Sequence, residues 1–198
     1  AFLKYYNIPG ICGIDTRALT KRLRTHGTMK GIITTGTETD RELLDKVAAL
    51  PDLSGQNFVK LASTSQIYSE GDGGKPVVLI DYGAKGNIIQ CLVKRGCKVT
   101  VVPCDMSSDE ILSLNPAGIM LSNGPGDPKD CQDQINTIRK LIGKKPIFGI
   151  CLGHQLVALA NNADTEKLKY GHRGGNHPVK DIEKNLTYIT SQNHGYTI

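Results

Sequence analysis

The chain has 198 residues, 39% of them apolar and 22 of them glycine, so its apolar content is that of a folded protein and excludes a disordered chain. Lys and Arg outnumber Asp and Glu by 24 to 19, and the net charge of +5 suits an anionic ligand or an acidic partner surface but is too small to indicate nucleic-acid binding. The longest apolar runs have about five or six residues, far fewer than the ~20 of a membrane span, and the first residues lack the regions of a signal peptide.

Short elements are predicted in the first part of the chain. Capping signals predict a helix over 16–23 that ends near Gly27, and a second helix over 40–50 that is stopped by Pro51. The apolar run 29–35 between them predicts a strand. This part is too small to be a convincing complete domain.

Composition changes most sharply at residues 69–76, a polar, glycine-rich run that predicts a flexible linker. We therefore divide the chain into three parts: 1–66, the C-terminal part of a smaller α/β domain; 67–76, the linker; and 77–198, a larger domain. Because the chain starts at Ala1 and stops inside a strand-like run, we expect it to be part of a longer protein, with the larger domain incomplete at its C-terminal end.

Apolar strands alternate with helices from residue 77 onward. Strands that are apolar on both faces indicate a parallel sheet covered on both sides, and right-handed crossovers then give an open, doubly wound α/β fold. In such sheets the functional site lies beyond the C-terminal ends of the strands. The predicted strands are 77–82, 98–103, 117–122 and 146–150; the predicted helices are 87–95, a short one capped at 107–110, 132–142 and 152–161; and 167–170 and 186–190 are expected to add later strands.

Six cysteines stand at positions 12, 91, 97, 104, 131 and 151. No two of them form a CxxC pair, which disfavours a zinc ribbon or a thioredoxin-type site. A chain of this length and core content does not need a disulfide framework, so we expect free thiols and a reducing compartment.

The segment Gly149-Ile-Cys-Leu-Gly153 lies where a predicted strand passes directly into a helix. It has the form of a nucleophile elbow, with Cys151 in place of serine. Two glycines permit the tight turn, and the N–H of Leu152 at the helix N-terminus is placed to stabilise an oxyanion. The alternative, a thiol packed at a strand end, is favoured for the other five cysteines but not for Cys151, because only Cys151 has this context.

The loop 122–128, with the sequence Ser-Asn-Gly-Pro-Gly-Asp-Pro, follows another apolar strand. Alone it could be only a rigid turn. Beside an elbow, Gly124 becomes a candidate second N–H donor to the oxyanion, because a glycine can present its amide where side chains would clash. No Gly-Lys-Ser/Thr follows, so the loop is not a phosphate-binding P-loop.

A cysteine nucleophile needs a base, usually a histidine that a third polar group orients. His26 lies near a basic run and is expected on a solvated helix face, and His154, on the nucleophile's own helix, is expected to be structural. His172 and His177 lie in a polar, glycine-rich loop, and His194 follows a predicted strand, where it could reach a substrate. None is followed by a carboxylate at the spacing of an orienting group.

Residues 148–155, Phe-Gly-Ile-Cys-Leu-Gly-His-Gln, resemble the nucleophile motif of triad-type (class I) glutamine amidotransferases. Within that family, four further segments in the same order resemble the small, glutaminase subunits of carbamoyl-phosphate synthetases. They are Gly13-Ile-Asp-Thr-Arg-Ala-Leu-Thr20, Leu121-Ser-Asn-Gly-Pro-Gly-Asp-Pro128, Tyr170-Gly-His-Arg-Gly-Gly-Asn-His-Pro178 and Thr190-Ser-Gln-Asn-His-Gly-Tyr196.

The resemblance implies a flavodoxin-like amidotransferase domain in which Cys151 attacks the side-chain amide of L-glutamine. Ammonia leaves, and water then hydrolyses the glutamyl thioester. Gly124 and Leu152 would form the oxyanion hole. The residues implied in substrate binding are Gly124, Gly126, Leu152, Gln155, Asn193, Gly195 and Tyr196.

The resemblance also implies a partner, a large synthetase subunit or a fused synthetase domain, to which the ammonia passes. That component would use ATP, Mg and bicarbonate to make carbamoyl phosphate for pyrimidine and arginine synthesis. No cofactor or metal is expected in this chain, and neither nucleic acid nor a membrane is expected as a partner. The expected location is the cytoplasm.

One departure from the family pattern concerns the base. The family's catalytic His and Glu lie in a His-Pro-Glu motif downstream of the Gln-Asn-His-Gly segment, and residues 1–198 contain no such motif, since His177-Pro178 is followed by Val179. We therefore expect the base and its orienting group beyond Ile198. A family serine that helps to bind glutamine is also expected outside the chain.

Three alternatives remain. A glutaminase serving another synthetase, such as one for anthranilate or GMP, is disfavoured by the segments 171–178 and 15–17. A catalytically inactive regulatory or docking domain is disfavoured by Cys151 within an intact elbow motif. A flavodoxin-like electron carrier is disfavoured because no phosphate loop follows the first strand of the larger domain.

Overall fold

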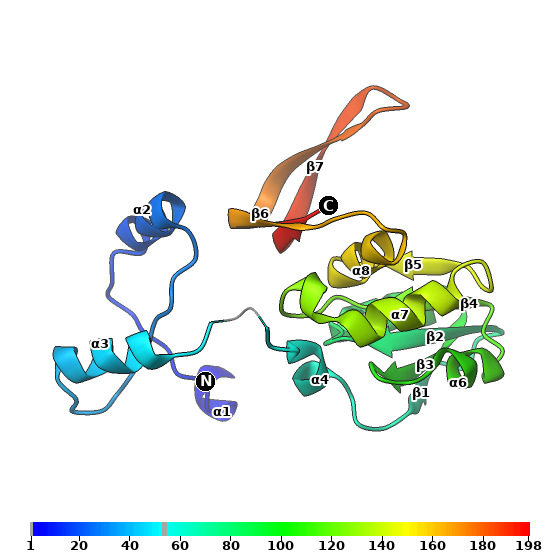
Figure 1. Ribbon diagram of the computed structural model, residues 1–198, viewed down its shortest axis with the longest axis horizontal. Helices are drawn as coiled ribbons and strands as arrows, with labels where there is room; N and C mark the ends of the chain where they lie inside the picture. Colours follow the sequence, from blue (N-terminus) through cyan, green and yellow to red (C-terminus); the bar gives the residue numbers. More distant parts are fainter. Residues whose placement is uncertain (1, 53–54) are drawn as a thin grey trace. The chain divides into compact units, whose positions relative to one another are not determined.

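The computed structural model describes residues 2–52 and 55–198, which fall into two compact units (Figure 1). One unit contains residues 2–52 and Leu168–Gly195. The other contains residues 55–167 and Tyr196–Ile198. Residues 55–66, expected in the smaller domain, thus group with the large sheet.

The N-terminal segment of the first unit contains three helices, and its two capping predictions are confirmed. Helix α1 is Phe2–Tyr5, α2 is Thr16–His26 and α3 is Asp40–Ala49. Asp15 caps α2 by accepting a hydrogen bond from the N–H of Ala18, at 2.9 Å, and Gly27 ends the helix with φ of 88°. A capping box, formed by Thr39 and Glu42, opens α3.

The strand predicted over 29–35 is wrong, because these residues form no regular element. A strand gains its stability from a partner strand and from burial of one face. Here the side chains of Met29, Ile32 and Ile33 are 50%, 46% and 53% exposed. Within the part of the chain that the structure describes, the apolar run therefore has neither a partner strand nor a buried face.

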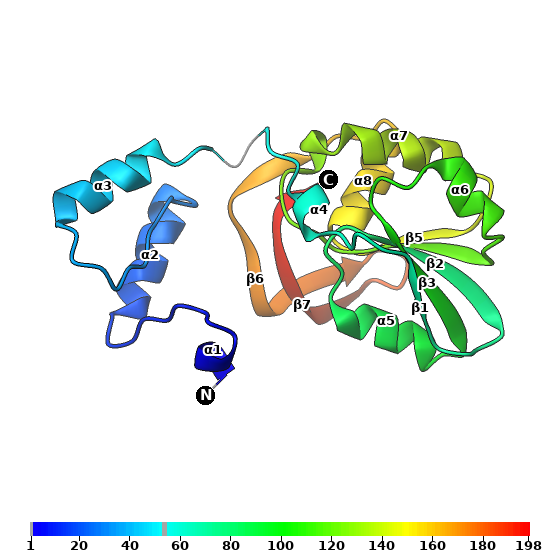
Figure 2. The same cartoon turned by 90° about the horizontal axis from the view of Figure 1, so that it is seen from below.

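Strands β6 (Glu166–Asp181) and β7 (Leu186–Thr197) form a two-stranded sheet of their own (Figure 2). The segment 171–178, expected to be a loop, and the segment 191–196, expected to follow a strand, lie inside these strands, which corrects the prediction. Pairing between the two long strands keeps these polar, glycine-rich segments extended. Their side chains do not alternate between apolar and polar, so the sequence gives no strand signal there.

The second unit is built on a five-stranded sheet in the order β1-β3-β2-β4-β5. β2 is parallel to both β3 and β4, β4 is parallel to β5, and only the edge strand β1 is antiparallel. This confirms the open, mostly parallel, doubly wound α/β fold. The strands are β1 (Tyr68–Glu70), β2 (Lys75–Asp81), β3 (Cys97–Pro103), β4 (Gly118–Leu121) and β5 (Ile147–Gly149).

The prediction of a flexible linker over 69–76 is wrong for half of that segment. Its first residues belong to β1 and its last residues to β2, which leaves only the turn 71–74 between the strands. Ser69 pairs with Thr100 in the ladder, and their hydroxyl oxygens lie 3.2 Å apart. A three-residue edge strand has too few residues for a periodicity signal, so only its polar composition was visible in the sequence.

Helices cover both faces of the sheet (Figure 2). One face packs on α5, where Ile89 joins a core with Leu79, Val99 and Val101. The other face packs on four helices, and Val59 of α4 is fully buried in that core. The helices of this unit are α4 (Phe58–Ala62), α5 (Gly86–Val93), α6 (Ser108–Ser113), α7 (Gln132–Leu141) and α8 (Leu152–Ala160), with a 3-10 turn η1 at Pro128–Asp130.

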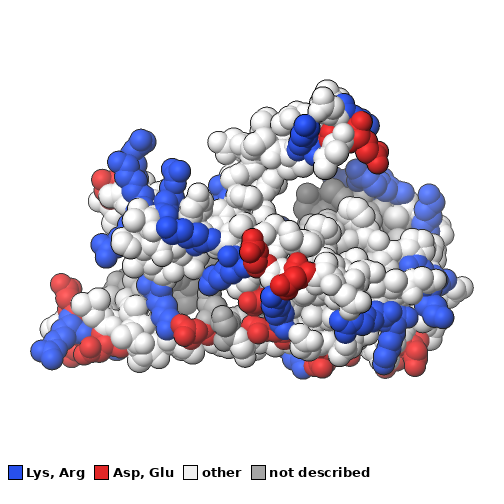
Figure 3. Space-filling model, turned by 45° about the horizontal axis from the view of Figure 1, so that its top comes forward, with Lys and Arg blue, Asp and Glu red and all other residues white. Residues whose placement is uncertain are grey.

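Charged side chains of both signs are interspersed over the face of the molecule shown in Figure 3. Lys and Arg do not gather there into one continuous basic field.

Candidate active site

The turn between β5 and α8 has an unusual backbone conformation. Cys151 stands between Gly149, the last residue of β5, and Leu152, the first residue of α8. Its φ of 52° and ψ of −109° are unusual for a residue with a side chain. Such strain persists where the surrounding structure imposes it, and it recurs at nucleophile elbows. The predicted strand-to-helix elbow is confirmed.

Both glycines of the elbow are required by close packing. A Cβ on Gly149 would lie 2.5 Å from the backbone of Gly153 and of His154. A Cβ on Gly153 would overlap the carbonyl oxygen of Leu121 and lie 2.7 Å from its Cβ. The backbone itself closes the turn, because the N–H of Gly153 donates to the carbonyl of Ser122 at 3.1 Å. The elbow is thus pressed against the end of β4.

Polar contacts fix the start of the loop that follows β4. Ser122 is fully buried, and its hydroxyl accepts a hydrogen bond from the N–H of Tyr82 at 2.8 Å. The side chain of Asn123 accepts from the N–H of Lys85 and donates to the carbonyl of Gly83, both at 3.0 Å. The loop that carries Gly124 is therefore tied to the residues that follow β2.

Gly124 lies between the elbow and the end of β2. A Cβ at this position would overlap the carbonyl oxygen of Tyr82 and lie 2.7 Å from Cδ2 of Leu152. The two residues predicted to donate to an oxyanion, Gly124 and Leu152, are thus brought together. Gly126, two residues further on, has a φ of +96°, a conformation that favours glycine.

Gln155 and Tyr196, both predicted to bind substrate, also meet in this unit. The side chain of Gln155 is nearly buried, and its Nε2 donates to the carbonyl oxygen of Tyr196 at 2.8 Å. Burial, with the nearby charge of Asp127, raises the pKa of Tyr196 to about 12, so the phenol is protonated at neutral pH.

The other predicted residues lie on the two-stranded sheet. Asn193 and Gly195 belong to β7, in the first unit. His194 on β7 lies beside His172 on β6, with 3.2 Å between His172 Nδ1 and His194 Nε2, and the same Nε2 lies 2.9 Å from Oε1 of Gln192. His172, expected in a loop, and His194, expected after a strand, are therefore on paired strands.

His154 is exposed on α8 in the second unit. It lies one turn from Cys151, and the structural role expected for it stays a prediction.

The six cysteines are free thiols in distinct environments. Burial raises the pKa of the Cys131 thiol to about 12 and also raises the pKa of Cys104. Cys97 is buried as well, whereas Cys91 and Cys151 are half-buried and Cys12 is exposed. Among the six cysteines, only Cys151 is both accessible and located at the N-terminus of a helix.

Residues that sequence reasoning missed support the loop between β4 and α7. Asp127 opens the turn η1 by accepting from the N–H of Lys129 at 2.9 Å, and its charge helps to raise the pKa of Tyr196. The Asp-Pro step in the sequence signals such a cap. Nothing in the sequence pairs Asp127 with Tyr196, because they are far apart along the chain.

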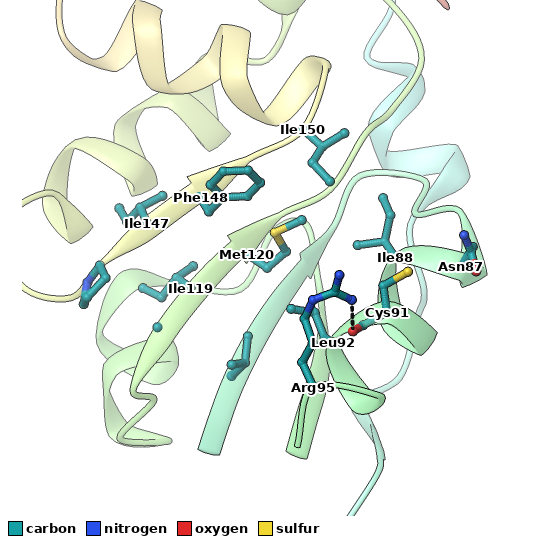
Figure 4. A pocket seen from close by; sticks show the side chains of 13 residues that line it. Asn87, Ile88, Cys91, Leu92, Arg95, Ile119, Met120, Ile147, Phe148 and Ile150 are labelled. Carbon is teal, nitrogen blue, oxygen red and sulfur yellow. Dashed lines mark hydrogen bonds between the residues drawn. The ribbon is translucent and has the colours of Figure 1, made fainter. Parts of the chain in front are cut away.

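An apolar groove of about 770 Å³ lies on the α5 side of the sheet, against β4 and β5 (Figure 4). Met120, Phe148 and Ile150 line it from the sheet, and Ile88 and Leu92 line it from α5. Cys151 is not among the residues that line it. The groove has the apolar character of a packing surface and lacks the polar groups that the elbow chemistry needs.

Within residues 2–52 and 55–198, no group of three or more His, Cys, Asp or Glu side chains is arranged to hold a metal ion. None of the helices described is both long and apolar enough to cross a membrane.

The fold and the elbow together define a class of protein, the α/β domains that present a nucleophile at a strand-to-helix turn beyond a parallel sheet. The family model "Glutamine amidotransferase class-I" matches residues 78–198. The chain therefore belongs to the class I glutamine amidotransferase family. The model "Carbamoyl-phosphate synthase small chain, CPSase domain" matches residues 1–33.

Curated relatives that carry the name "Carbamoyl phosphate synthase small chain" match the whole chain, and three of them illustrate the similarity. The protein of Clostridium perfringens is 52% identical over 197 residues, which cover 100% of this chain and 56% of the relative. The proteins of Listeria monocytogenes and Methanopyrus kandleri are 53% and 47% identical, again with 100% of this chain covered and with 54% and 56% of the relative. The chain thus spans about half the length of the curated relatives it matches.

One solved structure supports the fold. A protein assigned as a GMP synthase component from Thermoplasma acidophilum matches with a TM-score of 0.50 and 25% identity, over 64% of this chain and 67% of that one.

Proposed function

We propose that the chain is the glutaminase component of a glutamine-hydrolysing carbamoyl-phosphate synthase. The observation that carries the proposal is the elbow at Cys151, with Gly124 packed beside Leu152. The 47–53% identity to carbamoyl phosphate synthase small chains over the whole chain favours this member of the family.

In the proposed reaction, Sγ of Cys151 attacks the side-chain carbonyl carbon of L-glutamine. The negative charge that develops on the carbonyl oxygen is stabilised by the N–H groups of Leu152 and Gly124. Collapse of the tetrahedral intermediate breaks the C–N bond, releases ammonia and leaves a glutamyl thioester. Water then attacks the thioester, which yields glutamate and restores the thiol.

Ammonia departs only if a general acid protonates the leaving nitrogen. The family resemblance assigns this step to the histidine of a His-Pro-Glu motif, which residues 1–198 do not contain. The proposed role of this chain is to supply the nucleophile, the oxyanion hole and part of the glutamine pocket. Gly126, Gln155, Asn193, Gly195 and Tyr196 are the proposed pocket residues.

The proposed partner is a large synthetase subunit or fused domain that combines the ammonia with bicarbonate, using ATP and Mg. Carbamoyl phosphate formed in this way would enter pyrimidine or arginine synthesis in the cytoplasm. The proposed chemistry of this chain uses the cysteine thiol and backbone amides, and needs no cofactor of its own.

The test compares glutamine with ammonia as the nitrogen source in the full-length gene product in which this chain occurs, assembled with its synthetase. We expect Cys151→Ser to abolish carbamoyl phosphate synthesis from glutamine and to preserve synthesis from ammonia. Cys91→Ser is the matched control, because Cys91 is also half-buried but lies in α5. Equal use of glutamine by Cys151→Ser and the wild type would refute the proposal.

A further inference from the structure

Asp81, the last residue of β2, has a nearly buried side chain that accepts hydrogen bonds from three backbone N–H groups. Its Oδ1 accepts from the N–H of Gly83 at 2.9 Å and from the N–H of Ala84 at 2.7 Å. Its Oδ2 accepts from the N–H of Thr64 at 2.7 Å. Hydrogen bonds that a carboxylate accepts are about twice as strong as neutral ones. One side chain therefore fixes the turn 82–85 and ties it to the segment that follows α4.

The turn 82–85 holds the start of the loop that follows β4, the neighbour of β2 in the sheet. The N–H of Tyr82 donates to Oγ of Ser122 at 2.8 Å. The side chain of Asn123 donates to the carbonyl of Gly83 and accepts from the N–H of Lys85, both at 3.0 Å. All three bonds use backbone groups of the turn, so they form only while the turn keeps its shape.

Gly124 is packed against the same turn. A Cβ on Gly124 would overlap the carbonyl oxygen of Tyr82 and lie 2.9 Å from the Cβ of that residue. From the other side, a Cβ on Gly83 would lie 3.3 Å from Cδ of Pro125 and 3.7 Å from Cα of Gly124. The turn thus sets the place of the backbone that carries the proposed oxyanion donor. Such a donor is effective only when it is held in place before charge develops.

We infer that Asp81 is a positioning residue for the proposed glutaminase reaction, which fixes the turn 82–85 and so holds the backbone of Gly124 in place for the oxyanion. This inference rests on the proposed function. Asp81 makes no contact with glutamine in this account, and its effect passes through the turn and Asn123 to Gly124. Because the Gly124 N–H acts mainly when the oxyanion forms, removal of Asp81 should lower kcat and leave KM little changed.

The test is a double-mutant cycle on glutamine hydrolysis by the full-length gene product. We expect Asp81→Ala to lower kcat by up to about a hundredfold, which is the effect of misplacing a catalytic group by about 1 Å. In the Gly124→Ala background the loop is already displaced, so the same change should alter kcat by no more than about twofold.

Asp81→Asn tests which acceptor atom matters. Its side-chain oxygen can still accept from the N–H groups of Gly83 and Ala84, whereas its NH₂ group would face the N–H of Thr64 as a second donor. Asp81→Asn should therefore be less stable than the wild type and still have a higher kcat than Asp81→Ala. If Asp81→Ala does not fold, Asp81→Asn is combined with Asn123→Ala, and their effects on kcat should fail to multiply because both weaken one connection.

Gln134→Ala is the matched control for loss of stability. Gln134 is another buried polar residue of the second unit, and its Nε2 donates to the carbonyl of Cys104 at 3.2 Å. Its removal should lower Tm, measured by circular dichroism, without lowering kcat. Labelling of Cys151 by iodoacetamide requires no oxyanion donor, so its rate should be the same in the wild type, Asp81→Ala and Gln134→Ala.

The outcomes separate this inference from the proposed function. If the wild type hydrolyses glutamine and Asp81→Ala has the same kcat, the inference is overturned and the proposed function stands. The same holds if Asp81→Ala lowers kcat equally in both backgrounds, if the effects of Asp81→Asn and Asn123→Ala multiply, or if Gln134→Ala lowers kcat as much. If Cys151→Ser hydrolyses glutamine as fast as the wild type, the proposed function fails and this inference fails with it.

Discussion

Gly124 packs against Leu152 so closely that a Cβ at position 124 would lie 2.7 Å from Cδ2 of Leu152. The contact explains why the loop after β4 has glycine at this position. It also places Gly124, on the loop after β4, next to Leu152, the residue that follows Cys151, which supports the proposal that the two residues share an oxyanion hole.

Gly124→Ala should lower kcat for glutamine hydrolysis by on the order of 10²–10³ while KM changes little. The added methyl group must displace the loop, and the Gly124 N–H acts mainly when the oxyanion forms. Steady-state kinetics on the full-length gene product measure the effect. The matched control is Gly86→Ala, where a Cβ meets nothing within 4 Å, and an unchanged kcat in Gly124→Ala would remove this residue from the oxyanion hole.

Gly153→Ala should lower the free energy of unfolding by about 1–3 kcal/mol, the cost of forcing extra atoms into a packed site. A Cβ there would overlap the backbone of Leu121, which cannot move without disturbing β4. Urea denaturation followed by circular dichroism provides the measurement. Gly118→Ala is the comparison, because its Cβ meets its nearest neighbour, the carbonyl of Pro146, at an ordinary 3.6 Å; equal stability of both variants would contradict the packing account.

Cys151 should be the first of the six cysteines that iodoacetamide modifies at pH 7. Alkylation requires an accessible thiolate. The raised pKa values of Cys104 and Cys131, the latter about 12, leave these buried thiols protonated at that pH. Peptide mapping over a time course ranks the sites, and early labelling of Cys91 or Cys97 with Cys151 protected would count against the elbow.

Asp127→Asn should lower the pKa of Tyr196 from about 12 toward the usual ~10 of tyrosine, although burial, the larger cause, keeps it above that value. Because folding raises this pKa, the associated stability is fully present below pH ~10 and is lost as the pH rises toward 12. The difference in tyrosinate absorbance between each protein and its Tyr196→Phe counterpart isolates this one phenol. A titration unaffected by Asp127→Asn would show that the carboxylate does not act on Tyr196.

The sequence reveals those parts of the structure that depend on local patterns. Thr39 and Glu42 mark a helix start because a capping box is complete within four residues. Gly149 and Gly153 reveal the elbow because the turn imposes both glycines at fixed spacing around Cys151. These features depend only on residues that are close together in the sequence, so reasoning from short segments predicts them correctly.

Features that depend on distant partners were missed or wrongly predicted. The apolar run 29–35 has the composition of a strand but, among the described residues, no strand to pair with, whereas polar Ser69 is in a strand because Thr100 lies opposite it. The hydrogen bond from the Gln155 side chain to the carbonyl of Tyr196 likewise exists only after the chain has folded. Neither pairing leaves a periodic signal in one sequence.

The central claim is that Cys151 forms a thioester with the side-chain acyl group of glutamine. The most direct measurement is to mix the full-length gene product with isotopically labelled glutamine, quench in acid within one turnover, and map the label by mass spectrometry. A labelled glutamyl group is expected on the peptide that contains Cys151. The label should be absent from Cys151→Ser, and it should be lost when the quench is delayed until glutamine is exhausted. Glutamate release without any labelled Cys151 peptide, or with Cys151→Ser as active as the wild type, would contradict it.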